Sequence, residues 1–407
     1  MMNYKVLDLT DEKGQLAGQI YANLGAEVIK VEPPSGDPSR RIGPFYENDP
    51  KPENSLPFWA FNTGKKSVTL DLTKEEGREI FRKMASEADV ILESFAPGYM
   101  ASLGIGYDDL KKLNKGLVMV SITPYGQNGP YAGYKGDDLV LWAVGGVMYQ
   151  CGYPDRAPMR LNTPQTFLHA SLQAVAGSLA ALYARNTTGE GDYIDCSGME
   201  AVGHLMMYEP LAWKYQHRLT TRLGAQSWRG TLKLRQVWKC ADGMVAMRLI
   251  GGRQSRTLKP LIDWMVELGE GDEGDLLKYD WTNLDLYHMT EEEIAHIEEI
   301  WAAFFLKHTK KELFDEALKR HYDLTPVQNT KDLLSDDQLT SRDFWVQVEH
   351  EDLEKTFEYP GAPFKTTANI WNVRSRAPHI GEHNELVYEE LGYTPEEIAL
   401  LKEGGLI

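Results

Sequence analysis

The first half of the chain alternates between short apolar runs and longer stretches of helical periodicity. Short β-branched runs bounded by turn residues predict strands, and strands that alternate with helices predict βαβ units around a parallel sheet. We therefore expect an α/β fold with a right-handed, doubly wound sheet. The predicted strands are Lys5–Thr10, Glu27–Glu32, Ser67–Leu72, Ala88–Phe95 and Leu117–Thr123, and the predicted helices include Gly14–Leu24 and Lys74–Ala85.

Two segments depart from this alternation. Seven prolines from Pro33 to Pro57 predict one long irregular connection, which in a compact domain is usually functional or covers a partner. Beyond Tyr193–Cys196 the pattern changes, and residues 263–299 hold 13 acidic side chains and one lysine. We expect this segment to belong to a separate, smaller unit with a solvated acidic surface.

The composition is that of an ordinary soluble protein, with 42% hydrophobic and 25% charged residues among 407. That length favours about two to three domains. The formal net charge of −17 argues against nucleic acid and against an anionic membrane as partners, since both need a cationic surface. An anionic ligand would need local positive contacts.

Cysteine usage and the N-terminus indicate a cytoplasmic chain. Cys151, Cys196 and Cys240 lack the spacing of a metal site, so we expect reduced, buried thiols and no bound metal. The first ten residues lack the charged and apolar regions of a signal peptide. Phe167–Ala184 has no acidic or basic side chain except His169, but its Ser, Gln and Ala content predicts a buried helix rather than a membrane span.

The turn after the first predicted strand argues against a nicotinamide-dependent dehydrogenase. Doubly wound sheets bind ligands at the carboxyl ends of their strands. Here that turn, Asp11–Gly18, is not a GxGxxG loop, and its two carboxylates at the helix entrance would repel a pyrophosphate. The sequence also lacks a phosphate-binding P-loop, an HExxH zinc motif and a GxSxG nucleophile elbow.

Seven segments, in order along nearly the whole chain, carry a family resemblance. They are VLDLT at Val6–Thr10, GAEVIKVEPPSGDPSR at Gly25–Arg40, NTGKKSVTLDLTKEEGREIF from Asn62, ADVILESFAPG at Ala88–Gly98, SITPYGQNGPYAGYKGDDL at Ser121–Leu139, AGSLAALYARNTTGEGDYIDCSGMEA at Ala176–Ala201 and APHIGEHNELVYEELGYTPEEIALLKEGGLI at the end. Together they resemble the class III CoA-transferase family, which includes formyl-CoA transferase and the carnitine CoA-transferase.

The resemblance implies an architecture. It is a Rossmann-like, doubly wound large domain built from both chain ends, a smaller α+β domain between them, and a dimer whose two subunits interlock like rings. Combined with the change in composition, it predicts a large-domain segment at 1–224, a small acidic domain at 225–325 and a segment at 326–407 that returns to the large domain.

The resemblance also locates a missing residue. Members of the family transfer CoA between carboxylic acids through a catalytic aspartate, which forms a mixed anhydride and then an aspartyl thioester. That aspartate lies about ten residues before the glycine of a Gly-x-Leu-Ala-Ala-Leu helix, here Gly177–Leu182, and Phe167 occupies its position. From Arg156 through Gly189 there is no Asp or Glu, where the average of the chain would place about five. We infer that this chain lacks the family nucleophile.

Asp137, Asp138 and His169 are weaker catalytic candidates. The racemases of the family use a His and Asp pair, but Asp137 replaces the histidine and the aspartate is missing, so a racemase is not supported. An aspartate before the apolar run Leu139–Val144 is more often a helix N-cap than a catalyst. His169 follows the empty aspartate position, but a lone histidine beside an apolar helix is more often a satisfied core residue.

This chain has fewer of the CoA-binding residues than the resemblance implies. The family often has arginines in an NFRPG-like turn and near the following Leu-Gly, whereas this chain has SFAPG at Ser94–Gly98 and SLG at Ser102–Gly104, and lysine cannot replace their bidentate phosphate contacts. Glu93, where the family keeps a strand-end glutamate, is expected to be solvated or salt-bridged. The CoA contacts expected to remain are Arg40, Arg41, Lys65, Lys66, Leu70, Asp71 and Leu72, although Arg40 and Arg41 fit anchoring of the proline-rich segment equally well.

These observations predict a non-nucleophile subunit of a heteromeric CoA-transferase, whose paralogous partner supplies the aspartate. The resemblance implies a CoA thioester, succinyl-CoA, and a dicarboxylic acid such as benzylsuccinate, from anaerobic toluene degradation, as substrates, with no covalently bound cofactor. Two alternatives stay open. One is a self-sufficient CoA-transferase that uses Asp137 or Asp138, and the other is a non-enzymatic CoA-thioester-binding or scaffold protein.

Overall fold

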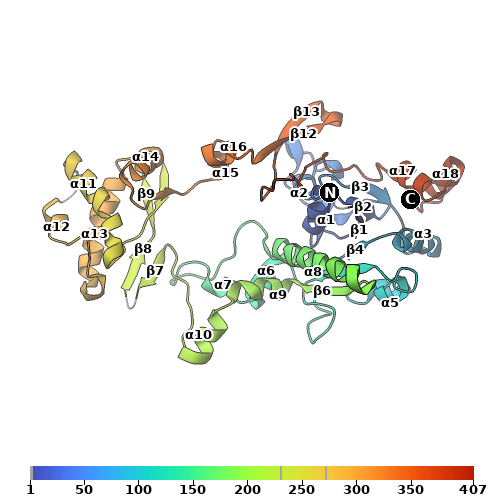
Figure 1. The fold of residues 1–407 in the computed structure, drawn as a ribbon, viewed down its shortest axis with the longest axis horizontal. Coiled ribbons are helices and arrows are strands. Elements are labelled where there is room, and N and C mark those ends of the chain that lie inside the picture. Colours follow the sequence, from blue (N-terminus) through green and yellow to red (C-terminus); the bar gives the residue numbers. More distant parts are fainter. Residues whose placement is uncertain (1–2, 230–231, 271–272) are drawn as a thin grey trace. The chain divides into compact units, whose positions relative to one another are not determined.

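A computed structural model describes residues 3–229, 232–270 and 273–407, so Met1 and Met2, the first residues of the predicted leader-free start, lie outside it (Figure 1). The chain separates into two compact units. The large unit comprises Met1–Tyr149, Arg160–Thr220 and Gln338–Ile407, and the small unit comprises Gln150–Met159 and Thr221–Asp337. Both chain ends therefore belong to the large unit.

A six-stranded parallel sheet forms the centre of the large unit, which confirms the predicted α/β fold and parallel sheet. Its order is β3-β2-β1-β4-β5-β6. The strands are β1 (Lys5–Leu9), β2 (Glu27–Glu32), β3 (Lys66–Thr69), β4 (Val90–Glu93), β5 (Val118–Thr123) and β6 (Tyr193–Ser197). The chain leaves β1 toward β2 and β3 and then returns to β4 on the other side, so the strand order reverses between β1 and β4. Doubly wound sheets bind ligands at the carboxyl ends of their strands at such a point.

Alternate strand residues point to opposite faces of this sheet. Val6 and Val28 pack against α1 (Gln15–Asn23) and α8 (Thr166–Thr188). Leu7 and Ile29 pack against α3 (Glu75–Ser86) and against α17 (Asn384–Glu390) and α18 (Pro395–Glu403) at the end of the chain. The remaining helices of the large unit are α2 (Leu56–Phe61), α4 (Tyr99–Ser102), α5 (Tyr107–Leu110), α6 (Asp138–Val144), α7 (Val147–Gln150, of which the last residue belongs to the small unit), α9 (Gly198–Gly203), α10 (Glu209–Gln216) and α16 (Asp337–Ser341, of which the first belongs to the small unit).

The C-terminal segment also closes the open edge of the sheet at β3. The N–H of Ser67 donates to Nδ1 of His383 (3.2 Å), and the N–H of His383 donates to the carbonyl of Ser67 (2.9 Å). Farther along, the N–H of Thr69 donates to Oδ1 of Asn384 (2.9 Å), and the Tyr388 hydroxyl donates to the Thr69 carbonyl (2.6 Å). An exposed strand edge invites pairing with other chains, and these groups satisfy it from within.

Helix α8 is the one described helix long and apolar enough to cross a membrane by length and composition. The buried helix expected over Phe167–Ala184 is confirmed for one face only. Ala170, Ala174 and Leu182 are buried against the sheet, whereas Leu172 is 52% and Tyr183 is 80% exposed.

The small unit has its own core of tryptophan, phenylalanine and aliphatic side chains, with Trp238 and Trp301 in edge-to-face contact at its centre. Its antiparallel sheet has the order β11-β10-β9, beside a separate hairpin of β7 and β8. The strands are β7 (Gln226–Arg229), β8 (Leu232–Arg235), β9 (Val237–Cys240), β10 (Gly243–Ala246) and β11 (Thr325–Pro326). The helices are α11 (Lys259–Leu268), α12 (Glu273–Leu277), α13 (Glu291–Phe305), α14 (Lys310–Arg320) and α15 (Thr330–Leu334).

The polar interior of the large unit lies between the first three strands and the proline-rich segment. Glu32, at the end of β2, receives two hydrogen bonds from Arg40, from Nε to Oε2 and from Nη2 to Oε1, both 2.7 Å long. Arg40, which is 1% exposed, also donates from Nη1 to Glu53 (2.9 Å) and from Nη2 to the carbonyl of Pro378 (2.9 Å). Its guanidinium carbon lies 3.8 Å from the centre of the Phe58 ring. Burial alone would raise the pKa of Glu32, but the Arg40 charge holds it below its usual range.

A second buried pair joins β1 to the start of β3. Lys65 donates from Nζ to Oδ2 of Asp8 (2.7 Å), to Oδ1 of Asn62 (2.7 Å) and to the carbonyl of Gln15 (2.8 Å). Gly18 of α1 packs directly on this pair, because a Cβ there would lie 2.3 Å from Asp8 Oδ2. Burial lowers the pKa of Lys65 to about 8.

We expect Arg40→Met to destabilise the large unit by about 3–5 kcal/mol, because it leaves Glu32 buried without its cation. Arg41→Met is the matched control, because Arg41 is exposed and donates one hydrogen bond to the Ser35 carbonyl, so its removal should change stability by no more than about 0.5 kcal/mol. Urea unfolding of both variants measures the difference, and equal midpoints would contradict a structural role for Arg40.

Candidate functional site

Asp11 and Ser94 join the segments that follow the carboxyl ends of β1 and β4. The Ser94 hydroxyl accepts the N–H of Asp11 (2.9 Å) and donates to Asp11 Oδ1 (2.8 Å). The ammonium of Lys13 pairs with the other oxygen of Asp11. The carboxylate of Asp11, expected to repel a pyrophosphate, is thus neutralised by a residue of its own turn.

Glu93 is the last residue of β4, next to Ser94. Glu93 is 4% exposed, and its Oε2 accepts the N–H of Phe95 (2.7 Å). We expected this carboxylate to be solvated or salt-bridged, but it is buried, and within the described residues it forms no ion pair. Burial raises its pKa to about 7. Its register partner on β5 is Ser121, whose hydroxyl hydrogen-bonds the Tyr193 hydroxyl (2.8 Å). Near neutral pH the Glu93 carboxyl can therefore donate as well as accept a hydrogen bond.

Asp137 and Asp138 both lie at the start of α6, but their side chains cap different helices. Asp137 is the N-cap of α6, as the sequence predicts for this pair, and its Oδ1 accepts the N–H of Val140 (3.0 Å). Asp138 is 8% exposed and reaches a different helix, where its Oδ1 accepts the N–H groups of Gln165 (2.8 Å) and Thr166 (2.9 Å) at the start of α8. Its Oδ2 lies 3.5 Å from Nη1 of Arg160. Asp138 therefore fixes the start of α8, next to Phe167.

Phe167 is the second residue of α8 and packs with the core on that side of the sheet. Its ring lies over the backbone of Gly198, where an added Cβ would be 3.2 Å from Phe167 Cε1 and 3.0 Å from Leu141 Cδ1. His169 is half-buried two residues farther along. Because residues two apart on a helix do not face each other, the structure does not bring His169 to the side of Phe167.

The predicted CoA-binding cations separate into interior and surface residues. The polar atoms of Arg40 and Lys65 bind protein acceptors, and both side chains are buried. Lys66 is half-buried and pairs with Glu27 at 2.5 Å, and Arg41 is exposed. Lys66 and Arg41 are thus the two of these cations that solvent reaches, and CoA binding by all four stays a prediction.

The predicted turn at Leu70, Asp71 and Leu72 follows β3. Leu70 belongs to the buried core and donates its N–H to the Glu32 carbonyl (2.7 Å). Asp71 accepts the N–H (3.0 Å) and hydroxyl (2.5 Å) of Thr73 at Oδ1, which lowers its pKa. Its own N–H donates to the carbonyl of Leu406 (2.8 Å), so the C-terminus holds this turn.

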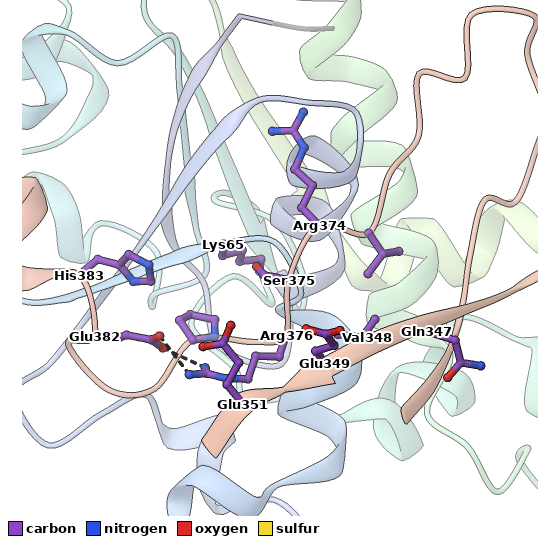
Figure 2. A pocket seen from close by; sticks show the side chains of 12 residues that line it. Lys65, Gln347, Val348, Glu349, Glu351, Arg374, Ser375, Arg376, Glu382 and His383 are labelled. Atoms are coloured by element: carbon purple, nitrogen blue, oxygen red, sulfur yellow. Dashed lines mark hydrogen bonds and ion pairs between the residues drawn. The ribbon is translucent and has the colours of Figure 1, made fainter. Parts of the chain in front are cut away.

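A cavity of about 410 Å³ in the large unit was not anticipated from the sequence (Figure 2). It lies between the hairpin of β12 (Trp345–His350) and β13 (Lys355–Pro360) and the segment 373–383. Arg376 and Glu382 are ion-paired in it (2.9 Å), beside Glu349 and Glu351, while Arg374 extends away from them. Its residues are Lys65, Gln347, Val348, Glu349, Glu351, Val373, Arg374, Ser375, Arg376, Pro378, Glu382 and His383.

The cysteines are free thiols, with Cys196 and Cys240 buried and Cys151 half-buried. Burial raises the pKa of the Cys196 thiol to about 12, so it is not a nucleophile at neutral pH. Within residues 3–229, 232–270 and 273–407, no group of three or more His, Cys, Asp or Glu side chains is placed to hold a metal ion.

Comparison with known proteins identifies the family. Residues 1–384 match the pattern described as CoA-transferase family III. The chain belongs to CoA-transferase family III. Relatives of this CoA-transferase include succinyl-CoA:(R)-benzylsuccinate CoA-transferase subunit BbsE of Thauera aromatica, with 34% identity over 99% of this chain and 97% of that one. Formyl-CoA:oxalate CoA-transferase of Streptomyces coelicolor is 31% identical over 99% of this chain and 98% of that one.

A solved structure of a CAIB/BAIF family protein from Brucella suis has the same fold as this CoA-transferase, with a TM-score of 0.81 and 26% identity over 95% of this chain and 98% of that one. The CoA-transferase homologues named above use CoA thioesters as substrates.

In this CoA-transferase we expect Asp138→Ala to lower the free energy of unfolding by about 1–3 kcal/mol, because the N–H groups of Gln165 and Thr166 lose their acceptor. Asp138→Asn keeps an oxygen at the same place and should cost less. Asp137→Ala is the surface comparison and should cost about 0.5–2 kcal/mol, as for other N-caps. Hydrogen exchange at the first turn of α8 reports the effect, and unchanged exchange in Asp138→Ala would contradict this anchoring role.

Proposed function

We propose that this chain is the non-nucleophile subunit of a heteromeric class III CoA-transferase that moves CoA from succinyl-CoA to a dicarboxylic acid such as benzylsuccinate. A paralogous partner supplies the catalytic aspartate. The two chains interlock in the cytoplasm, with a Rossmann-like domain built from 1–224 and 326–407, and a smaller domain at 225–325. Nucleic acid and membrane are not partners.

The observation that carries the proposal is the occupant of the nucleophile position. Helix α8 is formed, and its start is held by Asp138, yet its second residue is Phe167. The phenyl ring packs over Gly198 and cannot be acylated. No aspartate or glutamate lies between Arg156 and Gly189 to replace it.

The chemistry requires a carboxylate that is consumed and regenerated. The aspartate of the partner subunit attacks the thioester carbonyl of succinyl-CoA, the carbon–sulfur bond breaks, and CoA leaves as a thiolate. The thiolate then attacks the aspartyl carbonyl of the mixed anhydride and releases succinate. The carboxylate of the acceptor acid then attacks the aspartyl thioester, which forms a second mixed anhydride and displaces CoA as a thiolate. This thiolate attacks the acyl carbon of the acceptor, which yields the new CoA thioester and regenerates the free aspartate.

The surface of the large unit supports a partner chain. Tyr183 and Leu172 project from α8, and several other large apolar side chains are exposed on neighbouring segments. These are Leu139, Val140 and Val144 of α6, Leu211, Trp213 and Tyr215 of α10, and Leu205, Met207 and Tyr208 before α10. Helices α6 and α8 contact each other, and exposed apolar side chains that gather on adjoining elements are typical of a protein interface. The relative from Thauera aromatica is itself named as a subunit, which favours a heteromeric assembly.

Asp138 is the carboxylate on which one alternative, a self-sufficient enzyme, would depend. It is a buried carboxylate at the start of α8, and its Oδ2 accepts no hydrogen bond from any described residue. Its Oδ1 is committed to two backbone N–H groups and its Oδ2 faces Arg160, which favours a capping role over a nucleophilic one.

Purification of the native protein should yield a second chain of similar mass in equal amount, with an aspartate at the position equivalent to Phe167. Mass spectrometry of the intact complex and of its peptides measures both. Exclusive homodimers would count against the heteromeric assembly.

The isolated chain should show no CoA transfer from succinyl-CoA to benzylsuccinate, and the assembled complex should show it. Asp→Asn at the catalytic position of the partner should abolish that activity, whereas Asp137→Asn and Asp138→Asn in this chain should preserve it. Activity of the isolated chain that is lost in a folded Asp138→Asn variant would instead establish the self-sufficient enzyme. Binding of succinyl-CoA without turnover, even in the complex, would establish a binding or scaffold protein.

A further inference from the structure

Three segments of the large unit meet at His379. Its Nδ1 lies 3.0 Å from Oε2 of Glu53, at the far end of the proline-rich segment 33–57. Its Nε2 lies 3.4 Å from Oδ2 of Asp352, in the turn between β12 and β13. One imidazole ring therefore stands between two carboxylates that come from different parts of the chain.

This geometry fits one protonation state. A neutral imidazole has one N–H group and one lone pair, so it satisfies one carboxylate and turns its lone pair toward the other. An imidazolium donates from both nitrogens and is attracted to both carboxylates. The hydrogen bond with Glu53 correspondingly raises the pKa of His379, although burial opposes the shift.

The other charges around the ring are accounted for. Arg376 lies beside it but is paired with Asp352 (3.2 Å) and with Glu382 (2.9 Å). Glu382 accepts the main-chain N–H of His379 (2.7 Å). On the proline-rich segment, Arg40 shares Oε2 of Glu53 with the ring (2.9 Å). On the hairpin, His350 is buried, hydrogen-bonds Tyr359, and has a lowered pKa because of its burial, so it adds no positive charge near neutral pH.

The segment that this contact holds lies at the ligand edge of the sheet. Residues 33–57 follow the carboxyl end of β2, and doubly wound sheets bind ligands along that edge. Arg40 fixes the first part of the segment, but residues 41–44 are exposed beyond it, and Glu53 fixes the far part. The ring of Tyr46 packs edge-on against the ring of Phe357 in the hairpin, with 5.6 Å between the ring centres, and this contact does not depend on pH.

We propose that His379 is a proton-operated latch, which in its imidazolium form holds the segment 41–54 against the turn of the β12–β13 hairpin and which releases it as the pH rises. The protonated ring of His379 binds the carboxylates of both Glu53 and Asp352. Loss of the proton leaves one of them facing a lone pair. The segment is then held more weakly, by the bonds of Glu53 with Arg40 and with the N–H of Ile380, and by the contacts of Tyr46 with Lys355 and Phe357.

The direction of the pH dependence follows from the shift. A group whose folded-state pKa is raised stabilises the folded contact fully below the ordinary histidine value of about 6.5, and that stabilisation is lost as the pH rises through the higher folded-state value. The latch is therefore closed in mildly acidic solution and opens toward alkaline pH.

Hydrogen exchange of residues 41–54, corrected for intrinsic rates, tests the latch in the full-length protein between pH 5.5 and 8.5. We expect protection of this segment to fall about two- to fivefold across that range, the size expected of a partly exposed ion pair. His379→Asn carries no titrating charge, so its protection should be low throughout and independent of pH. His288→Asn, which removes an exposed histidine paired with Asp285 in the small unit, should behave as the wild type.

Two results would overturn the proposal. One is wild-type protection that stays constant across the pH range, a measurement that needs no variant. The other is a folded His379→Asn protein that keeps the wild-type pH dependence.

Discussion

The large unit depends on the buried ion pair between Glu32 and Arg40. Glu32 ends a central strand, and Arg40 lies in the irregular segment that follows, so the pair fixes where that segment begins. The same guanidinium reaches Glu53 and the carbonyl of Pro378, and thereby joins the first strands, the proline-rich segment and the end of the chain. Because a buried charge that loses its partner costs several kcal/mol, removal of this arginine would weaken the attachment of all three segments together.

Much of the sheet follows from the sequence. The expected strands Lys5–Thr10 and Glu27–Glu32 differ from β1 and β2 by at most one residue, because β-branched runs between turns give a strong local signal. The long hairpin and the closing of the β3 edge were not foreseen, since both depend on contacts between residues far apart in sequence. The buried charges were also missed, although Asp8, Lys30 and Glu32 sit at alternate, inward-facing positions of central strands.

The candidate site divides in the same way. The lack of any aspartate or glutamate from Arg156 through Gly189, a stretch that includes Phe167, is visible because it is a property of the sequence alone. The capping role of Asp137 was also predictable, because a cap is local. That Asp138 reaches across to Gln165 and Thr166 was not, since 27 and 28 residues separate them and only the packing of α6 against α8 brings them together.

The closing of the sheet edge by the C-terminal segment also has a consequence for synthesis. His383 joins Ser67 across 316 residues, and Arg40 joins Pro378 across 338. Domains generally fold as they leave the ribosome, N-terminal part first. Here the N-terminal strands emerge long before the residues that complete them, so the nascent chain carries an open strand edge and an incompletely paired arginine until residues 378–384 have been made.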